Sequence, residues 1–371
     1  MNYSIIGPVY PYRGGIAHHT TMLDKALRGA GHSTQVISFA RQFPGWLYPG
    51  ESDKDPSQHP IETEADFILD PFFPWTWLQA SRSIRSFNPD NVILQWWTTF
   101  WAVPYRVICQ TLRNRQYPII YMIHNVSPHE KRIWDTWLVK TGLSGADHFI
   151  VQNPRERSRL LDVIPGAKVS VCPMPVYSSL AEKRMDRSEA RVELNLPQNA
   201  FVLLFFGIVR PYKGLRILIE ALGHLAADEG YPYLIVAGEF WEDKSMYFEL
   251  IDQLHLQDKV IIDDRYVPNE QVNIYFSAAD ILVAPYTAGT QSAVASLALS
   301  YGIPLIVTEQ IADGINQSLM ESVHVIKAGD PVLLANAIKG EINNQKIEDS
   351  RSRFAADDWA RMIEIIEEIS G

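Results

Sequence analysis

The sequence predicts an α/β protein of two doubly wound domains, each with a parallel sheet between layers of helices. Its 371 residues are about twice the length of one ordinary domain. A strand, a glycine turn, an amphipathic helix and a second strand follow one another from residue 3, and the same order returns from residue 201. The strand segments are almost continuously apolar, which is typical of strands buried on both faces of a parallel sheet.

We place the first domain at residues 1–175. Its opening segments form a βαβ unit, with a strand at 3–7, a turn at 8–15, a helix at 16–29 and a strand at 35–39. Further strands are expected at 91–94, 119–123 and 148–152, and a loop rich in Pro, Asp and Ser at 45–60.

We place the second domain at residues 176–348. It opens with a strand at 201–206, a turn at 207–214 and a helix at 215–226, and further strands are expected at 233–237, 260–262, 281–284 and 305–307. The segment 349–371 has a helical pattern. We expect it to cross back to the first domain, and the alternative is that it is the last helix of the second.

The composition, 47% hydrophobic and 20% charged, is that of a globular protein. Residues 1–180 carry 17 Lys and Arg against 14 Asp and Glu, and residues 181–371 carry 16 against 29, so net charges of +3 and −13 sum to −10. This asymmetry indicates either domains with different partners or tuning of solubility.

Several classes of protein are disfavoured. The two cysteines, Cys109 and Cys172, argue against a disulfide scaffold or a cysteine zinc site. No apolar run reaches the ~18 residues of a membrane span, and no leader pattern opens the chain, so we expect a soluble, cytoplasmic protein. The zinc-hydrolase and serine-hydrolase motifs H-E-x-x-H and G-x-S-x-G are absent.

Gly14 and Gly15 lie in the first strand-to-helix turn. Adjacent glycines let a ligand approach the backbone, and the free N–H groups of a helix N-terminus favour an anion. The alternative is an ordinary tight turn. The G-x-G-x-x-G fingerprint of dinucleotide sites is absent.

His124 and Asn125 follow the apolar strand at 119–123. The carboxyl ends of parallel strands are where ligands bind in open α/β sheets, so we expect His124 to contact a substrate. His129 and Glu130 are as readily explained by loop capping.

Arg210 and Lys213 lie between a strand and a helix in the second domain, beside Gly214. Two cations at a glycine-bearing helix start suit a diphosphate, although the motif is no Walker A loop. Solvated surface cations are the alternative.

A polar loop precedes the helix that follows residue 292. Thr290, Gln291, Ser292 and Ala293 stand where hydroxyls and free N–H groups gather at a helix start, which indicates a second phosphate site. A plain N-cap is the alternative.

These pieces together resemble the two-domain GT-B glycosyltransferases, specifically the retaining family 4. The resemblance covers nearly the whole chain and rests on the order of modest motifs: Gly14-Gly15 followed by His19, His124-Asn-Val-x-Pro-His-Glu130, Ala146-Asp-His-x-Ile-Val-x-Asn153, Gly207-x-x-Arg210-x-x-Lys213-Gly214, Ala279-Asp280-x-x-x-Ala-Pro285 and Gly302-x-Pro304.

The resemblance implies two Rossmann-like domains facing a cleft. A nucleotide-diphosphate sugar would lie mainly on the second domain, with Arg210 and Lys213 on its diphosphate and His124 near its sugar. Retention would proceed on the front face, with the leaving phosphate accepting the acceptor's proton. Fixed cations and helix N-termini can stabilise that departure without a metal ion, so no metal or other cofactor is expected.

The sequence departs from the family pattern at one place. Family members commonly carry two glutamates eight residues apart before the Gly-x-Pro, and the corresponding positions here are Gly289 and Leu297. Thr290, Gln291 and Ser292 are the groups available to replace the first glutamate.

The acceptor side is expected on the first domain, with contacts from His19, Trp97, Trp101 and Asn125. Residues 95–104 are rich in aromatics, and arginines recur around them. This combination suits a glycan, a lipid-linked acceptor or an anionic membrane at the inner face of the plasma membrane, and an aromatic core strand is the alternative. Nucleic acid is not expected, because no binding motif occurs.

The sequence therefore predicts a retaining glycosyltransferase that uses a nucleotide sugar in bacterial surface polysaccharide or glycolipid synthesis. Two alternatives stay open. One is a nucleotide-sugar epimerase or hydrolase of the same fold, and the other is a catalytically silent scaffold protein.

Overall fold

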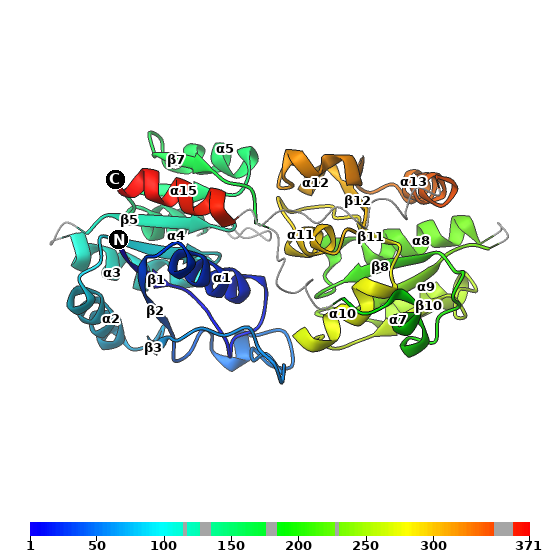
Figure 1. Ribbon diagram of the computed structural model, residues 1–371, viewed down its shortest axis with the longest axis horizontal. Helices are drawn as coiled ribbons and strands as arrows, with labels where there is room; N and C mark the ends of the chain where they lie inside the picture. The colour runs from blue at the N-terminus through cyan, green and yellow to red at the C-terminus, as the bar shows by residue number, and fades with distance from the viewer. Residues whose placement is uncertain (114–116, 127–134, 176–183, 227–229, 345–358) are drawn as a thin grey trace. The chain divides into compact units, whose positions relative to one another are not determined.

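The computed structural model describes residues 1–113, 117–126, 135–175, 184–226, 230–344 and 359–371 (Figure 1). It confirms the predicted fold class, because the chain forms two α/β units with parallel sheets of seven and six strands. Unit 1 comprises Met1–Asp55, Pro60–Pro173 and Trp359–Gly371, and unit 2 comprises Pro56–His59 and Met174–Asp358.

The sheet of unit 1 has the strand order β3-β2-β1-β4-β5-β6-β7, and its paired strands are parallel. The strands are β1 (Asn2–Ile6), β2 (Ser33–Phe39), β3 (Asp66–Leu69), β4 (Asn91–Trp96), β5 (Ile119–Ile123), β6 (His148–Val151) and β7 (Val169–Val171). The helices are α1 (Gly15–Gly29), α2 (Pro74–Phe87), α3 (Ala102–Arg113), α4 (Asp135–Leu143), α5 (Pro154–Val163) and α15 (Trp359–Ser370). The chain builds outward from β1 in both directions, so the strand order reverses between β1 and β4.

The two faces of this sheet have separate cores. Alternate residues of β4 show the division: Leu94 packs under α2, α3 and α4, whereas Ile93 packs under α1 and α15. Helix α15 is therefore part of the core of unit 1, through the buried side chains of Trp359, Met362 and Ile366.

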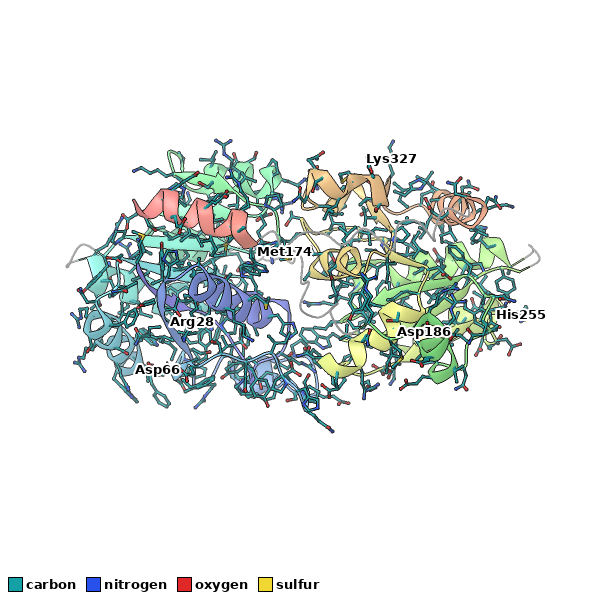
Figure 2. The ribbon with its side chains drawn as sticks, in the orientation of Figure 1. Arg28, Asp66, Met174, Asp186, His255 and Lys327 are labelled. Carbon is teal, nitrogen blue, oxygen red and sulfur yellow. The ribbon has the colours of Figure 1, made fainter. Side chains whose placement is uncertain are left out.

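On α1, Arg28 (labelled in Figure 2) forms an ion pair with Asp24, with Nε of Arg28 3.1 Å from Oδ2 of Asp24.

Unit 2 repeats this architecture with the strand order β10-β9-β8-β11-β12-β13. The strands are β8 (Val202–Phe206), β9 (Tyr233–Ala237), β10 (Val260–Asp263), β11 (Ile281–Ala284), β12 (Leu305–Thr308) and β13 (Val323–Ile326). The helices are α7 (Arg187–Glu193), α8 (Leu215–Leu225), α9 (Ser245–Gln253), α10 (Asn269–Ala278), α11 (Ala293–Ser300), α12 (Glu309–Ala312) and α13 (Pro331–Asn343). Helices α8, α9 and α13 share one core with the sheet, and the strand order reverses between β8 and β11.

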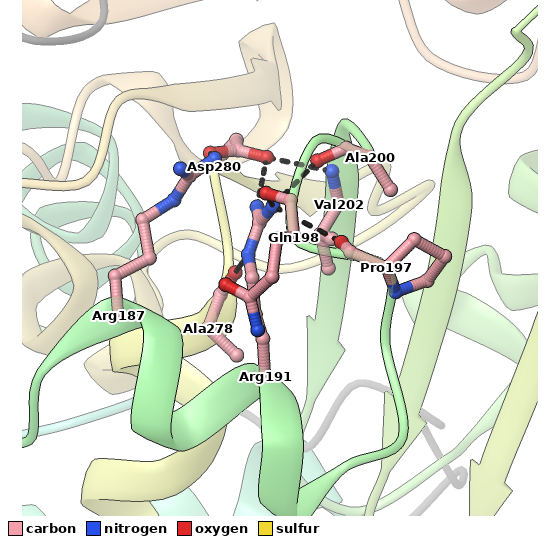
Figure 3. Close-up of polar contacts among 8 residues, drawn as sticks. All are labelled: Arg187, Arg191, Pro197, Gln198, Ala200, Val202, Ala278 and Asp280. Carbon is pink, nitrogen blue, oxygen red and sulfur yellow. Dashed lines mark hydrogen bonds and ion pairs between the residues drawn. The ribbon is translucent and has the colours of Figure 1, made fainter.

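A buried ion pair fastens the amino ends of β8 and β11 (Figure 3). Asp280 precedes β11, and its carboxylate accepts hydrogen bonds from Arg191, from Arg187 and from the backbone N–H of Val202, at 2.7, 2.7 and 2.8 Å. Arg191 is fully buried and also donates to the carbonyl oxygens of Ala278, Gln198 and Ala200. Asp280 of the family motif thus stabilises the fold at the edge of the sheet opposite its carboxyl ends.

Three strands were not expected: β3, β7 and β13. Each is an edge strand with several half-exposed or exposed residues, so none has the continuous apolar run of a central strand. The expected loop at 45–60 contains a 3₁₀ turn at Gly45–Leu47, and Lys54 forms an isolated antiparallel bridge with Tyr12.

Across the described residues, we find no helix with both the length and the apolar character needed to cross a membrane.

Candidate active site

The predicted site residues gather at the carboxyl edge of each sheet. Those of unit 2 follow β8 and β11 in the chain, and those of unit 1 follow β1, β4 and β5. Open α/β sheets bind ligands at this edge, where the strand order reverses.

Gly207 lies next to the candidate ligand-binding groups of unit 2. It follows β8 with a φ of 89°, in the region that favours glycine. A β-carbon at this position would lie 3.3 Å from Cγ2 of Val294 and 3.5 Å from Nζ of Lys213. The Lys213 ammonium and the first turn of α11 therefore converge above the same glycine.

Lys213 is held in an environment that disfavours its charge. Burial, and secondarily the positive charge of Arg210, lower its pKa to about 8. Its Nζ lies 5.7 Å from the ring centroid of Tyr286. A half-buried cation with a depressed pKa is stabilised by an anionic ligand, which makes Lys213 suited to phosphate.

The turn that carries both cations is clamped to the loop after β11. Gly214 has a φ of 75°, and a β-carbon there would lie 2.2 Å from the carbonyl oxygen of Pro285. The N–H of Thr287 donates to the carbonyl oxygen of Tyr212 at 2.7 Å. These contacts fix the backbone of Lys213 relative to the loop that leads to α11.

Arg210 extends over the aromatic ring of Trp241. Its guanidinium carbon lies 5.4 Å from the ring centroid, and the indole N–H of Trp241 donates to Oε2 of Glu239 at 3.0 Å. A cation–π contact of this kind orders an arginine side chain without removing its charge.

Ser292 caps the N-terminus of α11. Its Oγ accepts a hydrogen bond from the N–H of Ala295 at 3.3 Å and lies 3.3 Å from the hydroxyl of Tyr286. Ala293 is the first residue of the helix, and Thr290 and Gln291 form the loop before it, with Thr290 buried. The predicted second phosphate site is thus a capped helix start next to Lys213.

In unit 1, Gly14 precedes the first residue of α1, Gly15. Gly14 has a φ of 105°, and its carbonyl oxygen accepts from the N–H of His18 at 3.2 Å. No heavy atom would lie within 4 Å of a β-carbon at Gly14, so this turn is open as well as glycine-dependent.

His124 lies where the sequence predicts, directly after β5, but its ring is enclosed and only 2% of the residue is exposed. Its Nε2 is 2.6 Å from Oε1 of Gln95, and its Nδ1 is 3.4 Å from Nε2 of Gln152. Burial, with a smaller effect of nearby His19, lowers the pKa of His124 well below its usual value. The ring is therefore neutral at physiological pH. Asn125, the next residue, is half-buried.

Two expected acceptor contacts need correction. His19 and Trp101 have no exposed surface, so neither can contact an acceptor in this structure. Trp101 is a core residue that packs on Phe39 with ring centroids 4.5 Å apart and donates its indole N–H to the carbonyl oxygen of Gln42. Trp97 remains partly exposed at the rim of the core. His129, Glu130, Lys131, Arg132 and Arg115 lie outside the described residues.

Sequence reasoning missed three buried polar residues around His124. Gln95 and Gln152 contact its ring, and Glu156 of α5 accepts the N–H of Val126 at 2.6 Å, which fixes the chain after His124. Gln95 is the residue before the last of the apolar strand β4, and Gln152 directly follows the apolar strand β6. A polar side chain at the carboxyl end of a buried strand is the sequence feature that could have identified both residues.

Two family models match successive parts of the chain. The model described as Glycosyltransferase Family 4 matches residues 13–179, and the model described as Glycosyl transferases group 1 matches residues 186–357. The chain belongs to the group 1 glycosyltransferases. The expected family membership is therefore confirmed.

Curated relatives of this glycosyltransferase match in part. D-inositol 3-phosphate glycosyltransferase 1 of Catenulispora acidiphila is 27% identical over 54% of this chain and 50% of its own length. Lipopolysaccharide 1,2-N-acetylglucosaminetransferase of Salmonella typhimurium is 22% identical over 52% of this chain and 51% of its own length. The chain thus spans about half the length of the curated relatives it matches.

Solved structures of other proteins share the fold over the whole chain. HepE of Anabaena in complex with UDP-glucose has a TM-score of 0.71 at 18% identity, covering 100% of this chain and 99% of that chain. Sucrose-phosphate synthase of Thermosynechococcus elongatus has a TM-score of 0.70 at 18% identity, covering 99% and 98%.

As for metals, the described part of this glycosyltransferase contains no group of three or more His, Cys, Asp or Glu side chains that could hold an ion. The groups that its unit 2 site offers to a ligand are two cations, a helix start and hydroxyls. This set can bind and stabilise phosphate oxygens.

Proposed function

We propose that the chain is a retaining glycosyltransferase that moves a sugar from a nucleotide-diphosphate sugar to a glycan or lipid-linked acceptor. The observation that carries the proposal is the convergence of the Lys213 ammonium and the first turn of α11 above Gly207, with Arg210 on the same turn. HepE of Anabaena, which shares this fold, has been solved in complex with UDP and with UDP-glucose, which supports a nucleotide-sugar donor.

The chemistry follows from charge. Departure of the nucleoside diphosphate places negative charge on its β-phosphate, and Arg210, Lys213 and the N–H groups of α11 would stabilise that charge. Donors already fixed in place need no reorganisation in the transition state, and one such donor contributes about 3–4 kcal/mol to lowering the barrier. In a front-face reaction the departing phosphate oxygen takes the acceptor's proton, so no protein nucleophile or metal ion is needed.

The acceptor would bind unit 1, and bacterial surface polysaccharide or glycolipid synthesis is the proposed setting. The names of the curated relatives include transfer to inositol phosphate and to lipopolysaccharide, which supports a polyol, a glycan or a glycolipid as the acceptor class.

We also propose contact with an anionic membrane, which would place the protein at the inner face of the plasma membrane. The residues that support this are those of the aromatic face, defined as Phe72, Phe73, Trp75 and Leu78 at the start of α2, which are 50%, 38%, 62% and 40% exposed. Arg41 lies over the rings of Phe72 and Phe73, and exposed aromatics beside a cation suit a lipid interface. Flotation with anionic and neutral liposomes at low salt tests it: Trp75→Ser should reduce binding to anionic liposomes, and wild-type protein that stays in solution with both would refute it.

A panel of nucleoside diphosphates and their common sugar conjugates, with thermal unfolding as the readout, tests the donor site. A ligand that binds only the native state raises stability by about 2.7 kcal/mol at a hundredfold excess over Kd. NMR of the product of the stabilising donor then gives the anomeric configuration. Product formed without acceptor would favour an epimerase or hydrolase, inverted product would refute retention, and no stabilisation by any donor would favour a silent scaffold.

A further inference from the structure

A buried polar cluster lies where β1, β4, β5 and β6 end. His124 follows β5, Gln95 is the penultimate residue of β4, Gln152 follows β6, and His19 lies on α1. His19, Gln95 and Gln152 are all fully buried. Buried polar atoms of this kind are costly unless their arrangement is fixed by function or by partners.

The backbone of His124 is anchored to β4. Its N–H donates to the carbonyl oxygen of Trp96 at 2.9 Å, which continues the ladder between β4 and β5 beyond the last strand residue. The ring can therefore adjust only by rotation of its side chain, and its neighbours decide which nitrogen carries the proton.

Gln95 and Gln152 lie on opposite nitrogens of this ring. Oε1 of Gln95 is 2.6 Å from Nε2, a short contact in which an amide oxygen can only accept, so Nε2 carries the proton. Nε2 of Gln152 donates to Nδ1 across 3.4 Å, which is longer than an ordinary hydrogen bond. The bond to Gln95 is therefore the firm one, and the bond to Gln152 is the weaker one.

Gly7 makes this arrangement possible. A β-carbon there would lie 2.6 Å from Cγ of Gln95 and 2.7 Å from Oγ1 of Thr20. The side chain of Gln95 thus crosses from β4 over the end of β1, through space that any residue other than glycine would fill.

We propose that Gln95 is a positioning residue that fixes the proton of His124 on Nε2, so that His124 meets the substrate as a hydrogen-bond acceptor through Nδ1. The ligand class is a hydroxyl group, which can donate to Nδ1 in exchange for Gln152. This inference rests on the proposed function and on the expectation, which the family resemblance implies, that His124 lies near the transferred sugar. It assigns His124 to orienting a hydroxyl and gives it no part in transferring a proton.

The enclosure of the ring agrees with this role. Among the described residues, His19 contacts the ring: its ring centroid is 4.7 Å away, and burial lowers its own pKa to about 3. The ring centroid of Trp359, from α15, lies 5.2 Å from that of His19. The carboxylate of Glu156 accepts hydrogen bonds from the backbone N–H of Val126 and from the guanidinium of Arg159.

The test is ¹⁵N NMR of the full chain labelled at histidine, with the His124 signals assigned by their absence in His124→Phe. In the wild type we expect protonated Nε2 and unprotonated Nδ1 at pH 7. Gln95→Met should give a mixture of tautomers, whereas Gln152→Met, its matched control on the other nitrogen, should leave the proton on Nε2. Gly7→Ala keeps the amide but displaces it, so it should act like Gln95→Met.

A wild-type proton on Nδ1, or a tautomer that Gln152→Met changes and Gln95→Met does not, would overturn the proposal. With a donor found by the panel above, Gln95→Met should lower kcat about tenfold or more with KM within about twofold. An unchanged kcat in a variant whose tautomer has become mixed would also overturn it. Because the NMR needs no donor, a failure of the proposed function would appear separately, as wild-type protein with the expected tautomer and no turnover.

Discussion

Replacement of Arg191 by methionine should loosen unit 2 and leave unit 1 unchanged. The substitution removes a fully buried guanidinium whose Nη2 lies 2.7 Å from the Asp280 carboxylate. Removal of one partner from a buried ion pair costs about 3–5 kcal/mol, because the remaining charge stays buried. Arg187 and the N–H of Val202 still bind Asp280, which favours the lower half of that range. Four carbonyl oxygens lose a donor; the three within 3.1 Å contribute about 1 kcal/mol each, and that of Pro197, at 3.5 Å, contributes little.

The expected loss is thus about 6–7 kcal/mol, or roughly 10⁴- to 10⁵-fold in the opening equilibrium. Hydrogen exchange with mass spectrometry measures it on peptides of β8 and β11, with β4 and β5 of unit 1 as the internal reference. Arg187→Met is the matched control. Its side chain is 42% exposed, so it should cost less than about 1 kcal/mol. Equal effects of the two substitutions, or an acceleration below about tenfold in Arg191→Met, would refute the reasoning.

Three further predictions concern the site and its support. Gly214→Ala should weaken nucleoside diphosphate binding about tenfold or more in calorimetry, because φ is 75° and the added carbon meets the Pro285 carbonyl, whereas Gly230→Ala, with the same φ and open space, should not. Binding at pH 8 should take up about half a proton, since the Lys213 pKa of about 8 must rise beside a diphosphate; affinity should then fall as pH rises from 7 to 9, and calorimetry in buffers of different ionisation enthalpy that shows no uptake would contradict this. Trp359→Ala should destabilise unit 1 by about 3–5 kcal/mol, seen as faster exchange in β1 and β4 with β8 unchanged; unaltered exchange would mean that α15 is dispensable to that core.

The central strands were predictable because a strand that is buried on both faces has a continuous run of apolar residues. Strands β5, β9 and β11 have the bounds that the pattern gives. The edge strands β3 and β13 were not predictable, since three of the four residues in each are exposed or half-exposed and their pattern resembles that of a loop. The sequence also cannot show that Asp280 pairs with Arg191, because the two become neighbours only through folding.

The sequence predicted where in the fold the candidate site residues lie, but it did not predict which side chains contact one another. Glycines and cations between a strand and a helix place Lys213 and Gly207 at the carboxyl edge from sequence alone. That Gln95 and Gln152 occupy the two nitrogens of His124 depends on the register of β4, β5 and β6. For the same reason Trp101 looked like a surface aromatic, although the 3₁₀ turn Thr99–Trp101 turns it into the core.

The central claim is that unit 2 binds a nucleoside diphosphate through Lys213. Isothermal titration of UDP into wild type, Lys213→Met and Lys259→Met tests it most directly. Lys259 is the matched control, since it lies over the rings of Tyr231 and Tyr233 just before β10, at the opposite edge of the same sheet. A charge-assisted contact contributes about 1.5–3 kcal/mol, so Lys213→Met should weaken binding by at least about tenfold and Lys259→Met should leave it unchanged. Equal affinity in all three proteins, or no binding to the wild type of UDP or any other nucleoside diphosphate, would contradict the account.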